Sequence, residues 1–388
     1  MLSFFNSSTD AKAPNFHPVS ERPDLFGELE TKDLEWTCAG GFATETQTFY
    51  HFLEDETMIM CQVIHSSIGS PAKSTIPTPK RRFGARIHVS NFTTPPPGLD
   101  KRSSRADQFS ITCKPSTDPT YPEMYAIRAN LSDDLQVSLD VLRPALVPGF
   151  KVGSGPNGGF SYFGPNKDKP EGYVVHRFWP RTVANGHFIH KGRAVEAKGV
   201  GMMVHAIQGM RPNLVATRWN FAHFQSNAYG GVSAIQMEFT TLETHGRRGP
   251  GSGGVTVNIG SLVLGGKLAA ITAETKWPDE KQSDDTDIIS RAVHSLLENS
   301  PGKISATIKV DVGGPTAPKG LVEKVDVLAE IPYVIKTMVN YVAGTKPYIY
   351  QWQNRVKLFV RGPDTLIPGL SNGLELEGPL YNEASFIS

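Results

Sequence analysis

Apolar and polar residues alternate along much of this chain, in short runs separated by turn-forming residues. Between residues 136 and 142, Val137, Leu139 and Val141 alternate with polar neighbours. Successive side chains of a β-strand point to opposite faces, so a period of two indicates a strand with one buried face. Such runs recur at short intervals, which is typical of an antiparallel barrel or sandwich. The pattern predicts an all-β protein.

The first two runs predict a β-hairpin. Residues 43–52 are rich in threonine and aromatic side chains, residues 58–64 are apolar, and the acidic triplet 54–56 suits the turn between them. The prolines from residue 71 to residue 97 exclude a central strand there, except at 85–89. Further strands are expected at residues 109–113, 125–129, 136–142, 173–180, 186–190, 231–241, 255–264, 269–275, 304–312, 322–331, 347–351, 356–361 and 378–387.

Two segments predict helices instead. Apolar residues recur at helical spacing over residues 284–299, after an acidic start and before Pro301 and Gly302. A second, shorter helix is expected over residues 333–342, ended by Gly344. The glycine-rich segments 147–172 and 246–254 are expected to be long hairpin loops, because neither opens a helix that could bind a phosphate.

Composition narrows the class of protein. The chain has 388 residues, more than one usual domain of roughly 100–200 residues, so two domains are expected. Its 39 Lys and Arg against 38 Asp and Glu give a net charge of +1. This charge provides no broad positive field, and no nucleic-acid partner is expected. No apolar run approaches the roughly 18 residues of a transmembrane helix.

Metal and disulfide chemistry are not expected. Cys38, Cys61 and Cys113 are odd in number and match no zinc-ligand spacing, which indicates a reducing compartment and inert thiols. His187 and His190 are three positions apart on a predicted strand, so they point to opposite faces and cannot chelate one metal without a bend. We expect no cofactor and no catalytic triad.

The stretch from residue 199 to residue 225 is apolar enough to be buried, yet carries polar side chains at short intervals. Buried polar groups need hydrogen-bond partners, so these either brace a core or face a cavity that a ligand enters. In the structural interpretation, His205 and Asn220 brace a barrel corner, with Arg211 capping or stacking on Trp219. In the functional interpretation, the residues around a ligand head group are His205, Gln208, Trp219, Asn220, His223 and Gln225.

Six segments, in order from residue 36 to near the C-terminus, are similar to the fungal survival-factor family, the oxidative-stress survival proteins. Segments of this length are more specific than four-residue motifs. They are W-x-C-A-x-G-F-A-T-E-T-Q-T-F-Y (36–50), H-R-F-W-P-R (176–181), G-M-x-V-H-A-x-Q-G-M-R-P (201–212), R-W-N-F-A-x-F-Q-S (218–226), G-T-K-P-Y-I-Y-Q (344–351) and E-G-x-L-x-x-E-A-x-F-I (377–387).

The resemblance implies two consecutive antiparallel lipocalin-like β-barrels with one or two short helices. It also implies a protein that carries ceramide between endoplasmic reticulum and Golgi and supports survival under oxidative stress. On this basis residues 1–35 form an extended or weakly membrane-associating tail, residues 36–195 the N-terminal barrel and residues 196–388 the C-terminal barrel. A barrel of about eight strands can enclose one small or chain-like ligand, so the expected partner is a lipid or another elongated hydrophobic molecule.

Membrane contact is expected to be weak and peripheral. Family members that bind membranes have an amphipathic N-terminal helix, whereas here Leu2, Phe4 and Phe5 form only a short apolar tip before a polar stretch. One helical turn buries too little apolar area for stable attachment. The expected location is the cytoplasm, with the periphery of Golgi and endoplasmic reticulum membranes and the nucleus as further locations.

Two other classes of function are compatible with the sequence. Proteins with two lipocalin-like barrels include cofactor-free cyclases and hydratases that act on a polyene or terpenoid, and here His205 or His223 with Glu238 could serve as general acid and base. Alternatively, both barrels are filled by their own side chains, and the protein is a structural or interaction module.

Overall fold

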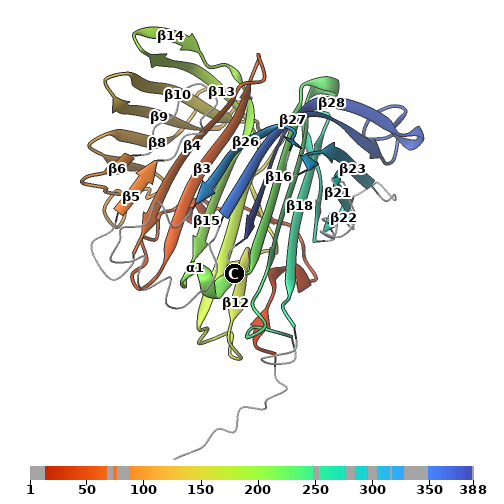
Figure 1. Cartoon of the computed structure of the whole chain (residues 1–388), viewed down its shortest axis with the longest axis horizontal. Helices are drawn as coiled ribbons and strands as arrows, with labels where there is room; N and C mark the ends of the chain where they lie inside the picture. The colour runs from red at the N-terminus through yellow and green to blue at the C-terminus, as the bar shows by residue number, and fades with distance from the viewer. Residues whose placement is uncertain are drawn as a thin grey trace, which may run out of the picture.

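Two antiparallel sheets form the protein. The computed structural model describes residues 14–67, 73–76, 87–247, 253–273, 275–276, 285–292, 294–295, 304–314, 317–326 and 348–386. In Figure 1 the long strands β3, β4, β8, β9 and β10 of the first sheet lie at the left, and β18, β21 and β23 of the second lie at the right. The sheets meet where β13 of the first contacts β17 and β18 of the second. The predicted all-β, lipocalin-like architecture is confirmed.

The first sheet has the central strand order β6-β5-β4-β3-β15-β13-β10-β9-β8-β7. It curls back on itself, because Thr93, just after β6, forms a β-bridge with Arg105 of β7. Its strands are β1 (Phe16–His17), β2 (Gly27–Glu28), β3 (Thr44–Leu53), β4 (Met58–Ser66), β5 (Lys73–Ile76), β6 (Ile87–Val89), β7 (Ser104–Ala106), β8 (Phe109–Pro115), β9 (Glu123–Ser132), β10 (Leu135–Arg143), β11 (Phe150–Lys151), β12 (Phe160–Phe163), β13 (Gly172–His190), β14 (Arg193–Glu196) and β15 (Gly199–Gln208).

The second sheet has the central order β20-β21-β23-β27-β28-β16-β17-β18-β19-β22. It also curls, since β19, near one end of this order, contacts β21, near the opposite end. Its strands are β16 (Arg218–Ser226), β17 (Val232–Thr240), β18 (Thr256–Leu264), β19 (Lys267–Thr272), β20 (Thr275–Lys276), β21 (Asp285–Ala292), β22 (His294–Ser295), β23 (Ile304–Asp311), β26 (Leu321–Asp326), β27 (Tyr348–Arg361) and β28 (Leu374–Phe386); β24 (Gly313–Gly314) and β25 (Ala317–Pro318) form a separate pair.

Helical structure is sparse in the described part of the chain. The short segment α1 (Pro212–Val215) lies between the two sheets in sequence, with proline at its first turn. Four single turns of 3₁₀-helix complete the set: η1 (Val19–Glu21), η2 (Thr31–Leu34), η3 (Ala228–Gly230) and η4 (Leu370–Asn372).

The helix predicted over residues 284–299 is wrong. Residues 285–292 form strand β21, which pairs antiparallel with β23, and Ile288 lies opposite Ile308. The segment contains Thr286, Ile288 and Ile289, β-branched residues that suit a strand. A neighbouring strand therefore outweighed the local helical spacing. The second predicted helix, over residues 333–342, lies outside the described residues.

The chain passes from the first sheet to the second after residue 196, the predicted start of the C-terminal barrel. Strand β15 pairs with β3 and β13, so it belongs to the first sheet, and β16 is the first strand of the second. The division of domains at residues 35 and 195 stays a prediction. In hydrogen-bonding terms, the transition lies in the α1 connection between β15 and β16.

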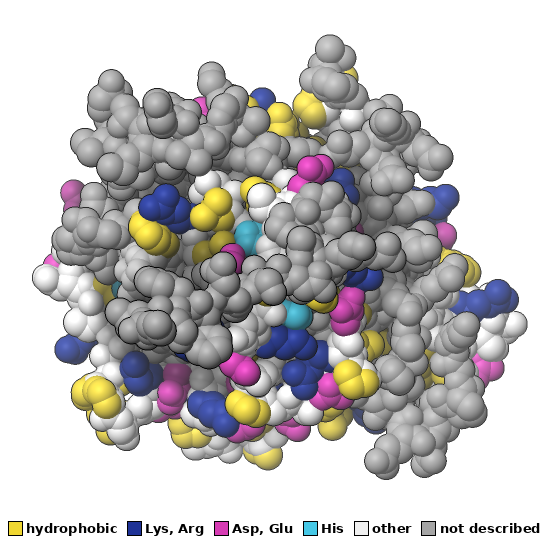
Figure 2. Space-filling view, turned by 90° about the horizontal axis from the view of Figure 1, so that it is seen from below, with side chains coloured by type: hydrophobic (Ala, Val, Ile, Leu, Met, Phe, Trp, Pro, Cys, Tyr) yellow, Lys and Arg dark blue, Asp and Glu magenta, His cyan; other side chains and the backbone are white. Residues whose placement is uncertain are grey.

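Strand alternation produces three apolar clusters. On β15, Met203 packs inside the first sheet, whereas Met202 packs in a cluster that both sheets share. On β16, Phe224 packs inside the second sheet, and Phe221 lies against the shared cluster. Each sheet thus has its own interior, and a seam joins them. On the face in Figure 2, basic and acidic side chains are interspersed among the described residues, as the small net charge suggests.

Candidate ligand-binding site

The six predicted site residues fall into separate regions, because neighbouring positions on a strand face opposite ways. His205 lies inside the first sheet, and Asn220 lies inside the second. Trp219, His223 and Gln225 face the seam from β16. Gln208 is half-buried at the end of β15, opposite Thr44 and Val174.

His205 braces the interior of the first sheet. Its Nε2 lies 2.8 Å from Oε1 of Glu45, and the side chains are 0% and 1% exposed. Glu45 also accepts hydrogen bonds from the backbone N–H groups of Thr37 and Cys38 and from the Thr37 hydroxyl. Burial acts to raise the pKa of Glu45, but the bonds from His205 and Thr37 outweigh it, so the pKa is lowered. For His205, the structural interpretation fits.

The segment that contacts Glu45 also fills the first sheet. Trp36 is completely buried, and its ring lies 5.5 Å from that of His205 and 5.4 Å from that of Phe92, centroid to centroid. Deeper in this interior, Tyr125 packs against Phe49 at 5.3 Å and against Trp179 at 5.1 Å. Large rings therefore occupy the space that a ligand of this barrel would need.

A buried ion pair anchors the same segment. Lys151 Nζ donates to Oδ2 of Asp33 at 2.7 Å, with both side chains almost fully buried. Arg177 donates to the carbonyl oxygen of Asp33. Breaking a buried pair on one side leaves an uncompensated charge, which is strongly destabilising. The segment from Asp33 to Cys38, which we call the strap, is thereby fixed across the first sheet.

At the seam, Arg181 reaches from β13 to the second sheet. Its Nη1 donates to Oε1 of Gln225 at 2.6 Å and to the carbonyl oxygen of Val232 at 3.1 Å, and its Nη2 donates to Oδ1 of Asn227 at 2.9 Å. The amide nitrogen of Gln225 lies 2.7 Å from Nε2 of His223. Gln225 and His223 are thus part of the contact that joins the sheets.

Trp219 packs in the seam without the partner that the sequence suggested. Its ring stacks on Phe239 with centroids 4.7 Å apart, and its edge meets His176 at 5.6 Å. The guanidinium of Arg211 lies over Phe42 instead, 4.0 Å from the ring centroid. The predicted stacking of Arg211 on Trp219 is therefore wrong: α1 separates the two residues along the chain, and Arg211 lies against Phe42, just before β3.

Inside the second sheet, Nδ2 of Asn220 donates to Oε1 of Glu238 at 3.0 Å. Two further amides lie on this interior face, Gln236 of β17 and Asn382 of β28. Sequence reasoning missed both, although Gln236 is a polar residue between apolar Ile235 and Met237, the same signal that singled out residues 199–225. This interior combines buried polar groups with the apolar cluster around Phe224.

The proposed acid–base pairs do not form. His205 binds Glu45, His223 faces the seam, and Glu238 faces the interior of the second sheet beside Asn220. Within the described residues there is also no group of three or more His, Cys, Asp or Glu side chains arranged to hold a metal ion. No described helix has both the length and the apolar character needed to cross a membrane.

The three thiols are poorly suited to redox sensing. Cys61 and Cys113 are buried, Cys38 is partly buried, and all three are free. Burial raises the pKa of Cys38 to about 11, and it raises the pKa of Cys61 and of Cys113 to about 12. Since the thiolate is the reactive form, these thiols are slow nucleophiles at neutral pH.

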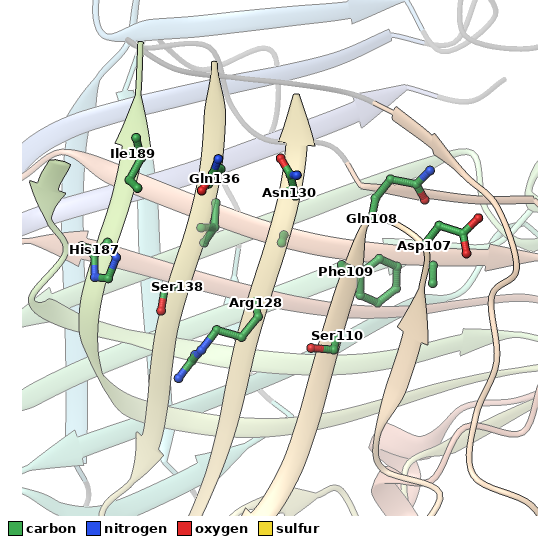
Figure 3. Close-up of a pocket in the computed structure, with 13 residues that line it drawn as sticks. Asp107, Gln108, Phe109, Ser110, Arg128, Asn130, Gln136, Ser138, His187 and Ile189 are labelled. Carbon is green, nitrogen blue, oxygen red and sulfur yellow. The ribbon is translucent and has the colours of Figure 1, made fainter. Parts of the chain in front are cut away.

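A groove of about 450 Å³ crosses β8, β9, β10 and β13 on the surface of the first sheet (Figure 3). Arg128, Ser138 and His187 project along it from three neighbouring strands, and the groove contains none of the predicted site residues. Its side chains are largely polar and exposed, so it does not provide an apolar wall for a chain-like ligand.

Comparison with known proteins identifies the family. The sequence model of the Svf1 family matches residues 5–388. The chain belongs to the Svf1 family. Relatives in this family include the ceramide-binding protein svf1 of Schizosaccharomyces pombe, 33% identical over 94% of this chain and 90% of the relative. The protein of the same name in Aspergillus fumigatus is 32% identical over 94% of this chain and 91% of its own length.

Solved structures support the fold of this Svf1-family chain. The crystal structure of CghA with Sch210972 superimposes with a TM-score of 0.54, covering 96% of this chain and 98% of CghA at 10% identity. A second structure of CghA gives a TM-score of 0.53 over 89% of this chain and 88% of CghA, also at 10% identity. At this identity the likeness concerns the fold alone.

Replacing Arg181 by Met should lower the free energy of unfolding by about 2–4 kcal/mol, because two buried acceptors across the seam, on Gln225 and Val232, and the exposed side chain of Asn227 lose their donor. Urea denaturation of the full chain measures the change. The exposed Arg193→Met substitution is the control, expected to stay within about 0.5 kcal/mol of wild type. Equal stability of the two variants would contradict the assigned role of Arg181.

Acid should destabilise the seam through His176. Burial lowers the pKa of His176 to about 3, so the folded state resists the proton that the unfolded state accepts below about pH 6.5. The stabilising contribution is thus present above pH 6.5 and is lost as the pH falls towards 3. Between pH 7 and pH 5 this group alone accounts for about 2 kcal/mol. Urea denaturation should show a correspondingly shallower pH dependence for His176→Phe; an unchanged dependence would refute the assignment.

Proposed function

We propose that this protein binds a ceramide-type lipid and carries it through the cytosol between endoplasmic reticulum and Golgi membranes. Its relatives in Schizosaccharomyces pombe and Aspergillus fumigatus are named ceramide-binding proteins. A ceramide has two alkyl chains, an amide and hydroxyl groups. A site for it therefore needs apolar walls together with a few fixed donors and acceptors.

The observation that carries this proposal is the mixed interior of the second sheet. Phe224 and Leu380 are fully buried there and belong to its apolar cluster. On the same interior face, Asn220 of β16, Gln236 of the neighbouring β17 and Asn382 of β28 supply buried amides. The combination of apolar and amide groups matches an amphiphile with a hydrogen-bonding head group.

A role in surviving oxidative stress belongs to the same proposal. Because burial raises the pKa of all three thiols, we attribute that role to the bound lipid rather than to direct oxidation of cysteine. Loss of lipid binding would then remove protection, whereas replacement of the cysteines would not.

Purified full-length protein should release ceramide on solvent extraction and mass spectrometry, and should transfer fluorescent ceramide between donor and acceptor vesicles. Fluorescent diacylglycerol, which has two chains and a hydroxyl but no amide, is the control ligand and should transfer more slowly. Recovery of no lipid together with no ceramide transfer would end the proposal. Turnover of an added polyene without a cofactor would favour the cyclase or hydratase alternative.

The predicted membrane-contacting residues Leu2, Phe4 and Phe5 lie outside the described residues, and their role stays a proposal. Replacing all three by Ser should reduce flotation with vesicles and slow ceramide transfer, because apolar area supplies the attachment. The amount of ceramide that co-purifies in solution should not change. If flotation and transfer match wild type, the tip is not the contact.

A further inference from the structure

Five neighbouring strands of the second sheet contribute one residue each to a continuous row across its interior face. Successive members are direct antiparallel partners, so the row follows from the strand register. Its composition is unusual for a barrel interior, because small residues alternate with residues that carry an amide side chain. The row is Gly260 of β18, Gln236 of β17, Ala222 of β16, Asn382 of β28 and Trp352 of β27.

The two amides in this row are buried without being satisfied. Gln236 is 0% exposed, and neither its Oε1 nor its Nε2 has a hydrogen-bond partner among the described residues. Asn382 is 1% exposed, and its Oδ1 has no partner there either. Buried amide atoms are almost always paired in folded proteins, since leaving them unpaired is costly. A missing partner that offers both a donor and an acceptor would satisfy them.

The register places only a small residue between the two amides. Gln236 and Asn382 both neighbour Ala222, so their backbones lie two strands apart, about 10 Å. Only the methyl group of Ala222 projects between them, and Gly260 on the other side of Gln236 has no side chain. A ligand amide placed over Ala222 would therefore be within reach of both side chains.

The rows on either side orient an amphiphile. In one direction along the strands, the next residues on the same face include Phe224 and Leu380, which are apolar and fully buried. In the other direction they are Asn220 and Glu238, which bind each other. Alkyl chains would lie on the apolar side, and hydroxyl groups would lie near the Asn220–Glu238 pair.

We infer that the second sheet alone holds the lipid, with the lipid amide hydrogen-bonded between Gln236 and Asn382 over Ala222. This inference rests on the proposed function and specifies its site. The first sheet offers a matched comparison, because Gln47 is likewise 0% exposed with both amide atoms unpaired. There, however, Trp36 packs on His205, the direct cross-strand neighbour of Gln47, so the strap takes the ligand's place.

The test compares equivalent amides in the two sheets. In the full chain, Gln236→Leu and Asn382→Leu should each weaken binding of fluorescent ceramide about tenfold, the effect of losing one or two hydrogen bonds. Gln47→Leu, the same change in the first sheet, should bind as wild type. Ala222→Phe fills the space and should abolish binding. With sphingosine, which lacks the amide, Gln236→Leu and wild type should bind alike.

Each outcome separates the site from the function. Loss of binding in Gln47→Leu but not in Gln236→Leu would move the lipid to the first sheet and overturn the inference, while the proposed function stands. Unchanged binding in every variant would place the lipid elsewhere, with the same consequence. Failure of the wild-type protein to bind ceramide would instead overturn the proposed function itself.

Two further measurements distinguish loss of the site from misfolding of a variant. Gln236→Leu removes an unpaired buried amide, so its melting temperature without lipid should be no lower than that of wild type. Photoactivatable ceramide crosslinked to the wild-type chain gives an answer that needs no variant. Crosslinks mapped by mass spectrometry should lie in residues 218–240 or 374–386; crosslinks confined to β3, β4 or β15 would overturn the assignment.

Discussion

The arrangement of the two sheets depends on the hydrogen bonds that the guanidinium of Arg181 donates across the seam. The register of β13 against β15 shifts between Trp179 and Thr182, and this irregularity turns Arg181 out of the first sheet towards the second. Burial lowers the pKa of Arg181 to about 10, so the group stays charged at neutral pH. Its three acceptors are neutral oxygens, on Gln225 and Val232 of the second sheet and on Asn227 just after β16, which makes the contact a set of charge-assisted hydrogen bonds.

Because these bonds fix the seam, each side chain of β15 and β16 must face either the seam or the interior of its own sheet. The amide of Gln225 is held at its oxygen by Arg181, and its nitrogen donates to the carbonyl oxygen of Gly201 and to the hydroxyl of Ser233. One slip in register would exchange the seam and interior faces of β16. It would bring Trp219 into the second barrel and expose Asn220 to the seam. The same bonds that join the sheets therefore determine which residues can meet a ligand.

The sequence predicted the strands well, because burial on one face imposes a period of two that is visible without any partner. It failed at residues 285–292, where pairing with β23 decided between two patterns that both fit the local spacing. It identified residues 199–225 as polar groups in a buried setting, yet grouped residues that face three regions. Gln236 and Asn382 are far apart in sequence and become neighbours of Ala222 only through strand pairing. Their relation could not be predicted from either segment alone.

Both interiors contain unpaired buried amides, Gln47 in the first sheet and Gln236 and Asn382 in the second, but among the described residues the strap packs only into the first. This difference has a consequence for exchange of the lipid. In the first sheet, the strap brings backbone N–H groups to Glu45, and Lys151 and Arg177 bind Asp33. Moving the strap away would leave these buried charges without partners. In the second, the amides of Gln236 and Asn382 have no partner among the described residues, and in the proposed site the lipid amide pairs with them. Loss of the lipid from this site would leave the two amides unpaired, so release is favoured where water or another lipid replaces it. A site built this way favours exchange at a membrane over loss of the lipid into solution.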